Sequence, residues 1–215
     1  MMDKIICVGK NYGAHAAEMS EPVPAEPVIF LKPPSVLRQM GDEGGVLEVT
    51  HPWDRGAVHY ECEIVLRLSR GVETASVPPS QREEDLWNYI DGVTLGLDMT
   101  LRDVQADLKK AGLPWTTGKV FNHSAIIGPW LSVTEGRKIW NESFTFALNG
   151  AVRQTGRTAD MMRQPCALIT AVGGLFPLRA GDVFFTGTPA GVGAVAAGDG
   201  GVLQWGTLKY AVKWA

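Results

Sequence analysis

The sequence predicts a β-rich α+β fold with a few short helices. Glycine occurs 25 times and proline 13 times in 215 residues, a share above the average for globular proteins, so we expect many turns. Most apolar segments are short and end at glycine, proline or asparagine, which is typical of strands. These strands do not alternate with long helices, and we therefore do not expect a doubly wound parallel sheet.

The composition excludes several classes of protein. Apolar residues make up 45% of the chain, charged residues 20%, and the formal net charge is −3, which excludes long disorder and gives no basic surplus for nucleic acid. The three cysteines form no paired motif, so we expect neither a disulfide framework nor a zinc knuckle. No apolar stretch is long enough to span a membrane. We expect one cytoplasmic domain over residues 1–215, with no nucleic-acid or membrane partner.

The first predicted elements are short strands and one short helix. Residues 4–8 and residues 28–31 are apolar runs that end at glycine and proline, and we expect two buried strands there. Residues 12–19 have the length and pattern of a short helix. Residues 35–57 contain many glycine, aspartate and proline breakers, which predict hairpins and loops.

Residues 59–68 show the clearest alternation of side chains in the sequence. One face of this predicted strand is apolar and consists of Tyr60, Cys62, Ile64, Leu66 and Leu68. The other face consists of His59, Glu61, Glu63, Val65 and Arg67. Because strand side chains point alternately to opposite faces, we expect this strand to have a core side and a carboxylate side.

The strongest helix signal covers residues 101–111. Thr100 occupies the N-cap position and Asp103 follows three residues later, an acidic variant of the capping box. The predicted apolar stripe consists of Leu101, Val104, Leu108 and Ala111. We expect Gly112 and Pro114 to end the helix.

The remaining predicted elements are also short. We expect helices over residues 81–89 and, after Pro165, within residues 161–173. Strands are expected over residues 93–98, 143–148, 151–154, 182–185 and 207–214. The Asn149-Gly150 pair between two of these strands is typical of a two-residue hairpin turn.

Three carboxylates are the best candidates for a metal site. Glu61 and Glu63 share one strand face with Cα atoms about 6.5 Å apart, and Asp98 ends a predicted strand. A carboxylate at the end of a strand commonly faces a crevice, and three oxygen ligands suit Mg²⁺, Mn²⁺ or Ca²⁺ better than zinc. An isolated Glu-x-Glu pair is more often a solvated strand face, and Asp98 could instead cap the helix that follows it.

A histidine–carboxylate pair lies on the predicted N-terminal helix. His15 and Glu18 are three residues apart, so the carboxylate can orient the imidazole as a general base. Spacing alone favours the alternative, an exposed helical pair. Gly9 and Gly13 would allow residues 9–20 to move as a lid.

Other polar residues stand in positions suited to a ligand. Arg102 and Gln105 lie in the first two turns of the predicted helix and are candidate ligand contacts. Lys32 and Lys119 lie in apolar surroundings, where a lysine needs a carboxylate partner or a shifted pKa. The glycine-rich residues 186–193 can present backbone N–H groups to an anion, but they lack the P-loop lysine, and a tight turn is the alternative.

Six segments of the chain form a specific combination. In chain order they are KIICVGKNYGAHAAEM, PVIFLKP, VHYECEIVL, LGLDMTLRDVQ, KKAGLPWTTGKVF and GDVFFTGTPAGVG. Together they resemble the fumarylacetoacetate hydrolase family, in its short, single-domain acylpyruvase-like branch, and they cover nearly the whole chain. The resemblance implies a mixed β-sandwich roll, a Mg²⁺ or Mn²⁺ cofactor, a homodimer, and small-molecule substrates of the 2,4-dioxo acid class.

The resemblance also implies roles for individual residues. It assigns the metal ligands to Glu61, Glu63 and Asp98. It assigns the water-activating dyad of a lid helix to His15 and Glu18. It assigns substrate contacts to Gln105, Lys119 and Thr188, with Lys119 stabilising developing negative charge. Lys10 stands where many relatives carry arginine, so this candidate carboxylate contact keeps the charge and loses the bidentate fork.

The activity implied by the resemblance is metal-dependent cleavage of a C–C bond in acylpyruvates such as fumarylpyruvate. Three carboxylates and a divalent ion leave one negative charge, with positions open for water and a 2-oxo acid. A bound ion would stabilise an enolate as a Lewis acid, and His15 would activate the attacking water. The same enolate chemistry permits decarboxylation or tautomerisation of oxaloacetate, or isomerisation of dienoates in aromatic catabolism. In a different class, a non-catalytic β-domain stabilised by Ca²⁺ would need neither His15 nor Glu18.

Overall fold

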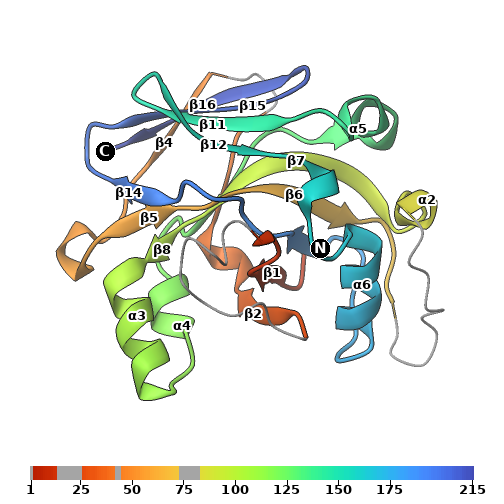
Figure 1. The fold of residues 1–215 in the computed structure, drawn as a ribbon, viewed down its shortest axis with the longest axis horizontal. Coiled ribbons are helices and arrows are strands. Elements are labelled where there is room, and N and C mark those ends of the chain that lie inside the picture. Colours follow the sequence, from red (N-terminus) through yellow and green to blue (C-terminus); the bar gives the residue numbers. More distant parts are fainter. Residues whose placement is uncertain (1, 14–25, 42–44, 73–82) are drawn as a thin grey trace.

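Three β-sheets with short helices at their edges make up the part of the chain that the structure describes (Figure 1). The computed structural model describes residues 2–13, 26–41, 45–72 and 83–215. The helices are α2 (Glu83–Leu86), α3 (Arg102–Ala111), α4 (Thr116–Lys119), α5 (Val133–Ile139) and α6 (Pro165–Gly173). Three 3₁₀ turns are η1 (Pro34–Val36), η2 (Trp53–Arg55) and η3 (Thr158–Asp160). Among the described residues, no helix combines the length and hydrophobicity needed to cross a membrane.

The largest sheet contains both parallel and antiparallel strand pairs. It consists of β1 (Ile5–Gly9), β2 (Val28–Lys32), β3 (Leu37–Gln39), β6 (Cys62–Leu68), β7 (Ile90–Asp98), β9 (Ala125–Ile127), β10 (Leu131–Ser132) and β13 (Val183–Phe185). Its strand order is β2-β1-β13-β6-β7-β9-β3, and β10 pairs with β7. The strands β6 and β7 therefore lie in the interior of the sheet, with a neighbour on each side.

Two smaller sheets complete the architecture. The second sheet consists of β4 (Val46–Val49), β11 (Phe144–Leu148), β12 (Ala151–Gly156), β15 (Gly200–Trp205) and β16 (Leu208–Trp214), in the order β12-β11-β15-β16-β4. The third consists of β5 (Val58–Tyr60), β8 (Thr100–Leu101) and β14 (Gly193–Val195), in the order β14-β5-β8. The prediction of a β-rich fold with a few short helices is confirmed.

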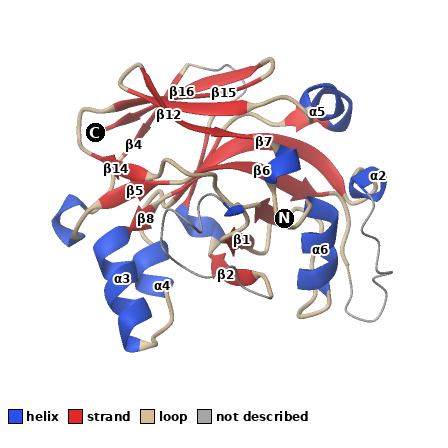
Figure 2. Cartoon of the chain, viewed as in Figure 1, coloured by secondary structure: helices blue, strands red, loops and turns tan. Residues whose placement is uncertain are grey.

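The main hydrophobic core lies between the first and second sheets. Figure 2 shows the strands of the second sheet as a layer above the long, curved strands β6 and β7. Phe146, Trp205 and Trp214 of the second sheet are fully buried in one cluster with the apolar residues of β6 and β7. The Tyr210 hydroxyl donates a hydrogen bond across this core to the backbone oxygen of Leu95, at 3.0 Å. Full burial of such side chains stabilises the packing of the two sheets by about 1.5–3 kcal/mol each.

The predicted strand over residues 59–68 is divided at Glu61. Its first part, β5, belongs to the third sheet, and its second part, β6, belongs to the largest sheet. The apolar face is buried in the main core, as predicted. On the carboxylate face Glu61, Glu63 and Val65 are buried, and Val65 joins a second apolar cluster, whereas His59 and Arg67 are partly exposed. The alternative of a solvated strand face is therefore wrong.

The helix α3 begins one residue later than predicted, and Thr100 is not its N-cap. The N-cap residue is Leu101, which makes no side-chain capping bond. The Thr100 hydroxyl accepts a hydrogen bond from Lys119 Nζ at 2.7 Å, and a bond from an ammonium group is stronger than a capping bond. Asp103 Oδ2 accepts from the backbone N–H of Ala57 at 3.1 Å instead of closing a capping box. Gly112 ends the helix in a left-handed conformation, with φ 67°, as predicted.

The prediction of hairpins over residues 35–57 is wrong for the residues described there. Strand β3 pairs in parallel with β9, and β4 pairs in parallel with β16, so both partners are distant in the sequence. The hairpin of β11 and β12 is confirmed, with φ 49° at Asn149 and φ 82° at Gly150. Helix α5 was not predicted, although Ser132 and Glu135 form a complete capping box at its start. The predicted helix over residues 12–19 falls almost entirely outside the described residues.

One buried histidine gives a prediction for stability against pH. His51 Nε2 accepts a hydrogen bond from Trp214 Nε1 at 3.1 Å, and Nδ1 lies 3.2 Å from the backbone oxygen of Asn122. The ring is therefore neutral, with its proton on Nδ1. Burial lowers the pKa of His51 from 6.5 to about 4.

Because the unfolded state binds the proton more tightly, the stabilising effect of neutral His51 is complete above about pH 6.5 and lost as the pH falls to about 4. We expect a loss of about 3 kcal/mol over this range. Thermal unfolding should show a steeper decline between pH 6.5 and 4 for the wild type than for His51→Gln. Parallel curves for the two proteins would contradict this assignment.

Candidate active site

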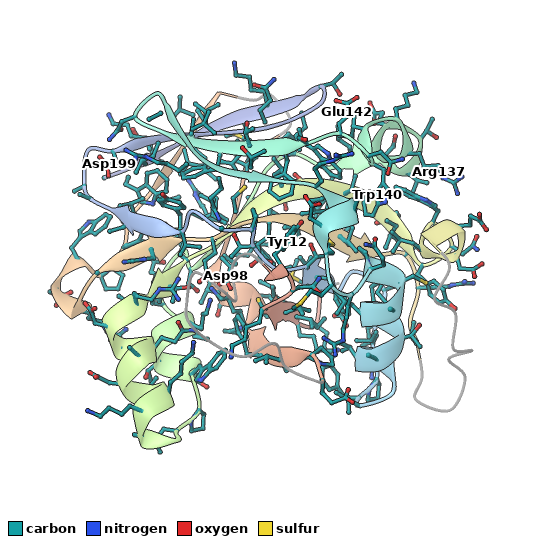
Figure 3. All side chains as sticks on the ribbon, viewed as in Figure 1. Tyr12, Asp98, Arg137, Trp140, Glu142 and Asp199 are labelled. Atoms are coloured by element: carbon teal, nitrogen blue, oxygen red, sulfur yellow. The ribbon has the colours of Figure 1, made fainter. Side chains whose placement is uncertain are left out.

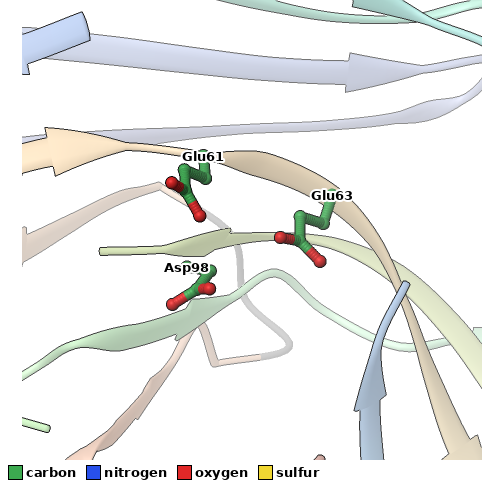
Figure 4. A group of neighbouring side chains, drawn as sticks. All are labelled: Glu61, Glu63 and Asp98. Atoms are coloured by element: carbon green, nitrogen blue, oxygen red, sulfur yellow. The ribbon is translucent and has the colours of Figure 1, made fainter. Parts of the chain in front are cut away.

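Three carboxylates, from β6, from the residue that precedes β6 and from the end of β7, meet in the interior of the protein (Figure 4). Glu61 lies between β5 and β6, Glu63 lies in β6, and Asp98 is the last residue of β7. In the antiparallel register Cys62 faces Leu97, and the Asp98 N–H donates to the Glu61 backbone oxygen at 2.9 Å, so the carboxylates share one region. One ligand oxygen from each of the three lies within 4.8 Å of the others. We call Glu61, Glu63 and Asp98 the carboxylate triad.

The carboxylate triad is shielded from solvent. The exposed fractions are 6% for Glu61, 2% for Glu63 and 1% for Asp98. In Figure 3, Asp98 lies toward the middle of the molecule, whereas Arg137 and Glu142 lie near its edge. Because a buried carboxylate requires a charged or hydrogen-bonding partner, the surroundings of the triad decide what it can bind.

Lys119 connects two members of the carboxylate triad. Its Nζ donates to Glu61 Oε2 and to Asp98 Oδ2, each at 2.8 Å, and to the Thr100 hydroxyl at 2.7 Å. Burial lowers the pKa of Lys119, but the charges of Asp98 and Glu61 outweigh it and raise the pKa above its usual value. The ammonium group therefore stays charged, and all three of its N–H donors have protein partners.

Two further cations contact the triad. Lys32 Nζ lies 2.5 Å from Asp98 Oδ1 and donates to the backbone oxygens of Met99 and Ser124 at 3.1 and 2.6 Å. The sequence predicted a carboxylate partner or a shifted pKa for Lys32, and the structure shows the first of these, with Asp98 as the partner. Arg102 pairs with Glu61 Oε1 through Nη2.

The arginine also orders the next candidate contact. Arg102 Nη1 donates to Gln105 Oε1 at 2.8 Å, and Gln105 is the buried residue of helix α3. The structure therefore brings Arg102, Gln105 and Lys119 together beside the triad. Three positive charges, on Lys32, Lys119 and Arg102, therefore match the three negative charges of the carboxylates. The charge predicted for this site from the sequence included the carboxylates and the metal ion but not these cations.

Glu63 is the triad member without a cationic partner among the ion pairs described. Its Oε2 accepts a hydrogen bond from the Gly187 N–H at 2.6 Å. Burial raises the pKa of Glu63 well above its usual value, and the charges of Asp98 and Glu61 raise it further, against the effect of the Gly187 bond. Glu63 is therefore the member of the triad that direct contact with a bound cation would stabilise most.

The donor set of the triad fits a hard divalent cation. Each ligand is a carboxylate oxygen, which suits Mg²⁺ and Mn²⁺. The three oxygens lie close enough to contact one ion, and Glu63 is destabilised by the charges that an ion would neutralise. The residues that would hold the ion are those that the sequence predicted.

The glycine-rich loop after β13 holds the triad rather than forming an isolated anion cradle. Gly187 has φ +102°, and a Cβ at this position would lie 2.7 Å from the Cβ of Asn11, so only glycine brings this N–H to Glu63. Asn11 Nδ2 in turn donates to the Thr186 backbone oxygen at 2.8 Å. The Thr186 hydroxyl donates to the backbone oxygen of Ile64 at 2.8 Å. The loop is thereby fixed to the strand that carries Glu63.

The Thr188 side chain is engaged within the protein. Its hydroxyl donates to the backbone oxygen of Cys62 at 2.9 Å and accepts from Gln154 Nε2 at 2.8 Å. Gln154 Oε1 also accepts from the Cys62 N–H at 2.9 Å. Gln154 was not predicted as a site residue, because nothing in its strand distinguishes it from an ordinary polar position. Because the Thr188 hydroxyl donates its proton to Cys62, it has no proton left to donate to a substrate at the predicted contact.

Some of the predicted site residues lie at or beyond the edge of the described chain. His15 and Glu18 fall outside the described residues, so the lid dyad stays a prediction. Lys10 directly follows β1 and has the left-handed φ of 59°. This backbone turn directs the chain out of the sheet at the start of the predicted lid.

A cleft of about 380 Å³ opens beside Lys119. It is lined by residues 28–31 of β2, residues 113–116 and Lys119 itself. The Phe30 ring lies 4.7 Å from Lys119 Nζ and 6.0 Å from the Trp115 ring. The cleft therefore leads from an aromatic wall toward the cation that joins Glu61 and Asp98.

Comparison with known proteins identifies relatives over nearly the whole chain. A family model described as fumarylacetoacetate (FAA) hydrolase C-terminal matches residues 4–211. The chain is 38% identical over 199 residues to the oxaloacetate tautomerase YcgM of Escherichia coli K12, covering 92% of this chain and 86% of that protein. It is 40% identical over 195 residues to the mitochondrial oxaloacetate tautomerase FAHD1 of Arabidopsis thaliana, covering 91% and 82%. Fumarylpyruvate hydrolase from Pseudomonas aeruginosa, solved with Mn²⁺ and pyruvate, superposes with a TM-score of 0.88 at 31% identity, covering 100% of this chain and 90% of that one.

Proposed function

Because the chain belongs to the fumarylacetoacetate hydrolase family, we propose that it is a divalent-cation-dependent enzyme that interconverts the keto and enol forms of oxaloacetate. The observation that carries the proposal is the buried carboxylate triad with its three matching cations. The relatives at 38% and 40% identity are named oxaloacetate tautomerases, which supports this substrate. Acylpyruvate hydrolysis, placed first by the sequence analysis, becomes the second candidate.

Glu61, Glu63 and Asp98 would hold the cation, and Mg²⁺ or Mn²⁺ suits their oxygen ligands. Such an ion, when bound, supplies Lewis-acid stabilisation to an enolate. The protein fixes the ligands in advance. Both oxygens of Asp98 contact lysine ammonium groups, and both oxygens of Glu61 contact a cation. Preorganised charge of this kind avoids reorganisation during the reaction.

The cationic side chains also select the charge of the substrate. Lys32, Lys119 and Arg102 neutralise the three carboxylates, so a divalent ion leaves the site with two positive charges. Oxaloacetate carries two carboxylates and restores neutrality in the buried site. In the reaction a proton moves between C3 and the C2 oxygen, and the predicted His15–Glu18 pair is our candidate for the group that accepts it.

Hydrolysis of an acylpyruvate is the second candidate because fumarylpyruvate hydrolase, solved with Mn²⁺ and pyruvate, shares the fold at 31% identity. This reaction also forms the enolate of pyruvate, as its leaving group. It needs an activated water in addition, and His15 with Glu18 is the predicted source of that base. The two candidates therefore share the triad and differ in the demand for water.

The proposal is tested by adding the enol form of oxaloacetate to the purified protein and following its ultraviolet absorbance. We expect a metal-dependent loss of the enol signal without release of pyruvate, and no acceleration in EDTA. Pyruvate release from oxaloacetate would indicate decarboxylation, and pyruvate release from fumarylpyruvate would support the hydrolase. A rate equal to the buffer rate with saturating Mg²⁺ and with saturating Mn²⁺ would contradict the tautomerase.

The homodimer expected from the resemblance is part of the same proposal. Sedimentation equilibrium should give about twice the chain mass of 23.2 kDa. A single species of one chain mass at micromolar protein would contradict it.

A further inference from the structure

A single peptide group connects Asn11 to the metal ligand Glu63. The backbone oxygen of Thr186 accepts a hydrogen bond from Asn11 Nδ2 at 2.8 Å. The N–H of the next residue, Gly187, donates to Glu63 Oε2 at 2.6 Å. Because the peptide bond between Thr186 and Gly187 is planar and trans, its C=O and N–H point in opposite directions. The two hydrogen bonds therefore hold one peptide plane from both sides.

The backbone conformation does not fix this peptide plane by itself. Gly187 has φ +102°, and glycine adopts positive and negative φ about equally readily. The peptide group can therefore turn over without strain at the glycine. In the reversed orientation the Thr186 oxygen would face the Glu63 carboxylate, and the Gly187 N–H would face the Nδ2 donor of Asn11. The two hydrogen bonds thus decide which orientation the peptide group takes.

Asn11 is held so that its donor faces Thr186. The Arg163 N–H donates to Asn11 Oδ1 at 2.9 Å, and the Arg163 backbone oxygen accepts from Nδ2 at 3.0 Å. With the carboxamide reversed, Oδ1 would face the backbone oxygens of Arg163 and Thr186. Both N–H donors of Nδ2 are used, and Asn11 is only 1% exposed. Solvent water therefore has no access to replace this side chain.

We propose that Asn11 is a positioning residue for the metal site, because its carboxamide keeps the Gly187 N–H on Glu63 and so holds this ligand in its binding geometry. The inference rests on the part of the proposed function that places a divalent cation at the carboxylate triad. Asn11 acts through the peptide group, since its carboxamide makes its described hydrogen bonds with Arg163 and Thr186. Hydrogen bonds in such a chain also strengthen one another.

Two variants of Asn11 test the effect on metal binding. Asn11→Ala leaves the buried Thr186 oxygen without its partner, so we expect the peptide group to turn and Glu63 to lose its donor. Residues that support metal ligands usually contribute about 10–100-fold to metal affinity, and calorimetric titration with Mg²⁺ should show a fall of this size. Asn11→Leu has the same branched shape as the wild type and should show the same fall. Both variants keep the backbone bond from Met162 N–H to the Asn11 oxygen at 2.8 Å.

Tyr210→Phe is the control for a general loss of stability. It removes the buried hydrogen bond from the Tyr210 hydroxyl to the Leu95 oxygen and leaves the shape of the ring unchanged. Melting temperatures in EDTA report the stability of each variant. We expect Tyr210→Phe to be destabilised and to bind Mg²⁺ as tightly as the wild type. Equal losses of Mg²⁺ affinity in Tyr210→Phe and the Asn11 variants, or unchanged affinity in a folded Asn11 variant, would overturn the inference.

A nuclear magnetic resonance measurement follows the peptide group directly. Three glycines follow a threonine in the sequence, namely Gly118, Gly156 and Gly187, so ¹³C-carbonyl threonine with ¹⁵N-glycine selects their amide signals. We expect the Gly187 proton at the lowest field, because its bond to a carboxylate is charge-assisted. Glu63→Gln, which weakens that bond, identifies the signal. In Asn11→Ala and Asn11→Leu this signal alone should move to higher field.

The same spectrum of the wild type keeps the inference falsifiable if the Asn11 variants do not fold. No signal at low field in the wild type would show that the Gly187 N–H is not held on Glu63, and would overturn the inference. Equal shifts of all three signals in a folded Asn11 variant would overturn it as well, because they would indicate a general structural change.

The outcomes distinguish this inference from the proposed function. Mg²⁺ binding that depends on Asn11, in a protein that does not convert oxaloacetate, supports the positioning role and refutes the tautomerase. Tautomerase activity in the wild type, with unchanged Mg²⁺ affinity in folded Asn11→Leu, refutes the positioning role alone. Absence of Mg²⁺ and Mn²⁺ binding to the wild type refutes both.

Discussion

The variant Lys119→Met should lose most of its activity while binding the divalent cation at least as tightly as the wild type. Lys119 Nζ lies 2.8 Å from both Glu61 Oε2 and Asp98 Oδ2, so its ammonium group competes with a metal for two of the three ligands. Removing it frees those oxygens. It also removes a preorganised charge from the proposed site of enolate formation, and the loss of one such group costs about 100-fold or more in turnover.

Two measurements on Lys119→Met separate these effects. Calorimetric titration with Mg²⁺ should give an affinity equal to or greater than that of the wild type, and the enol assay should give the fall in turnover. Lys32→Met is the matched control, because Lys32 contacts Asp98 but otherwise bonds to backbone oxygens. We expect it to lower thermal stability and to reduce turnover less. Loss of metal binding in Lys119→Met, or unchanged turnover, would contradict the account of Lys119.

The variant Glu63→Gln should shift the melting temperature in opposite directions without and with metal. Burial, and then the charges of Asp98 and Glu61, raise the pKa of Glu63 well above its usual value. A group with a raised pKa in the folded state stabilises the protein below its unfolded pKa, and that stability is lost as the pH rises. At neutral pH in EDTA, glutamine removes the unfavourable charge and its oxygen can still accept the Gly187 bond, so stability should increase.

With saturating Mg²⁺ the same variant should be less stable than the wild type. The variant lacks one charged metal ligand. Removal of a residue that only supports a ligand costs about 10–100-fold in metal affinity, so we expect removal of the ligand charge to cost at least as much. The stabilisation that a bound ion gives to the folded state falls accordingly. Differential scanning fluorimetry in EDTA and in Mg²⁺ measures both shifts. Equal destabilisation under both conditions would show that Glu63 has a structural role and does not bind metal.

Local patterns in the sequence predicted the parts of the site that depend on strand geometry. A period of two residues places Glu61 and Glu63 on one face of a strand, and the glycine-rich loop follows directly after an apolar strand. The same patterns predicted the β-rich class and the hairpin at Asn149-Gly150. None of these predictions required knowledge of which distant segments pair.

The parts that could not be predicted depend on long-range pairing. The apolar surroundings of Lys32 and Lys119 show that each needs a partner, but Asp98 is distant from Lys32 in the sequence and is brought to it only by the sheet. Thr100 has the sequence of a helix cap, yet the ammonium group of Lys119 takes its hydroxyl. Gln154 reaches the site from a hairpin of the second sheet, and no local signal marks it.

The central claim is that a divalent cation held by Glu61, Glu63 and Asp98 allows this protein to enolise 2-oxo acids. Proton exchange at the methyl group of pyruvate tests it most directly, because the exchange requires the enolate and is independent of hydrolysis and decarboxylation. Proton NMR in D₂O with the Mg²⁺-loaded protein should show the methyl signal of pyruvate decaying as deuterium enters. The decay should stop in EDTA and in Glu63→Gln. Exchange that continues in EDTA, or a constant methyl signal with the Mg²⁺-saturated wild type at saturating pyruvate, would contradict the claim.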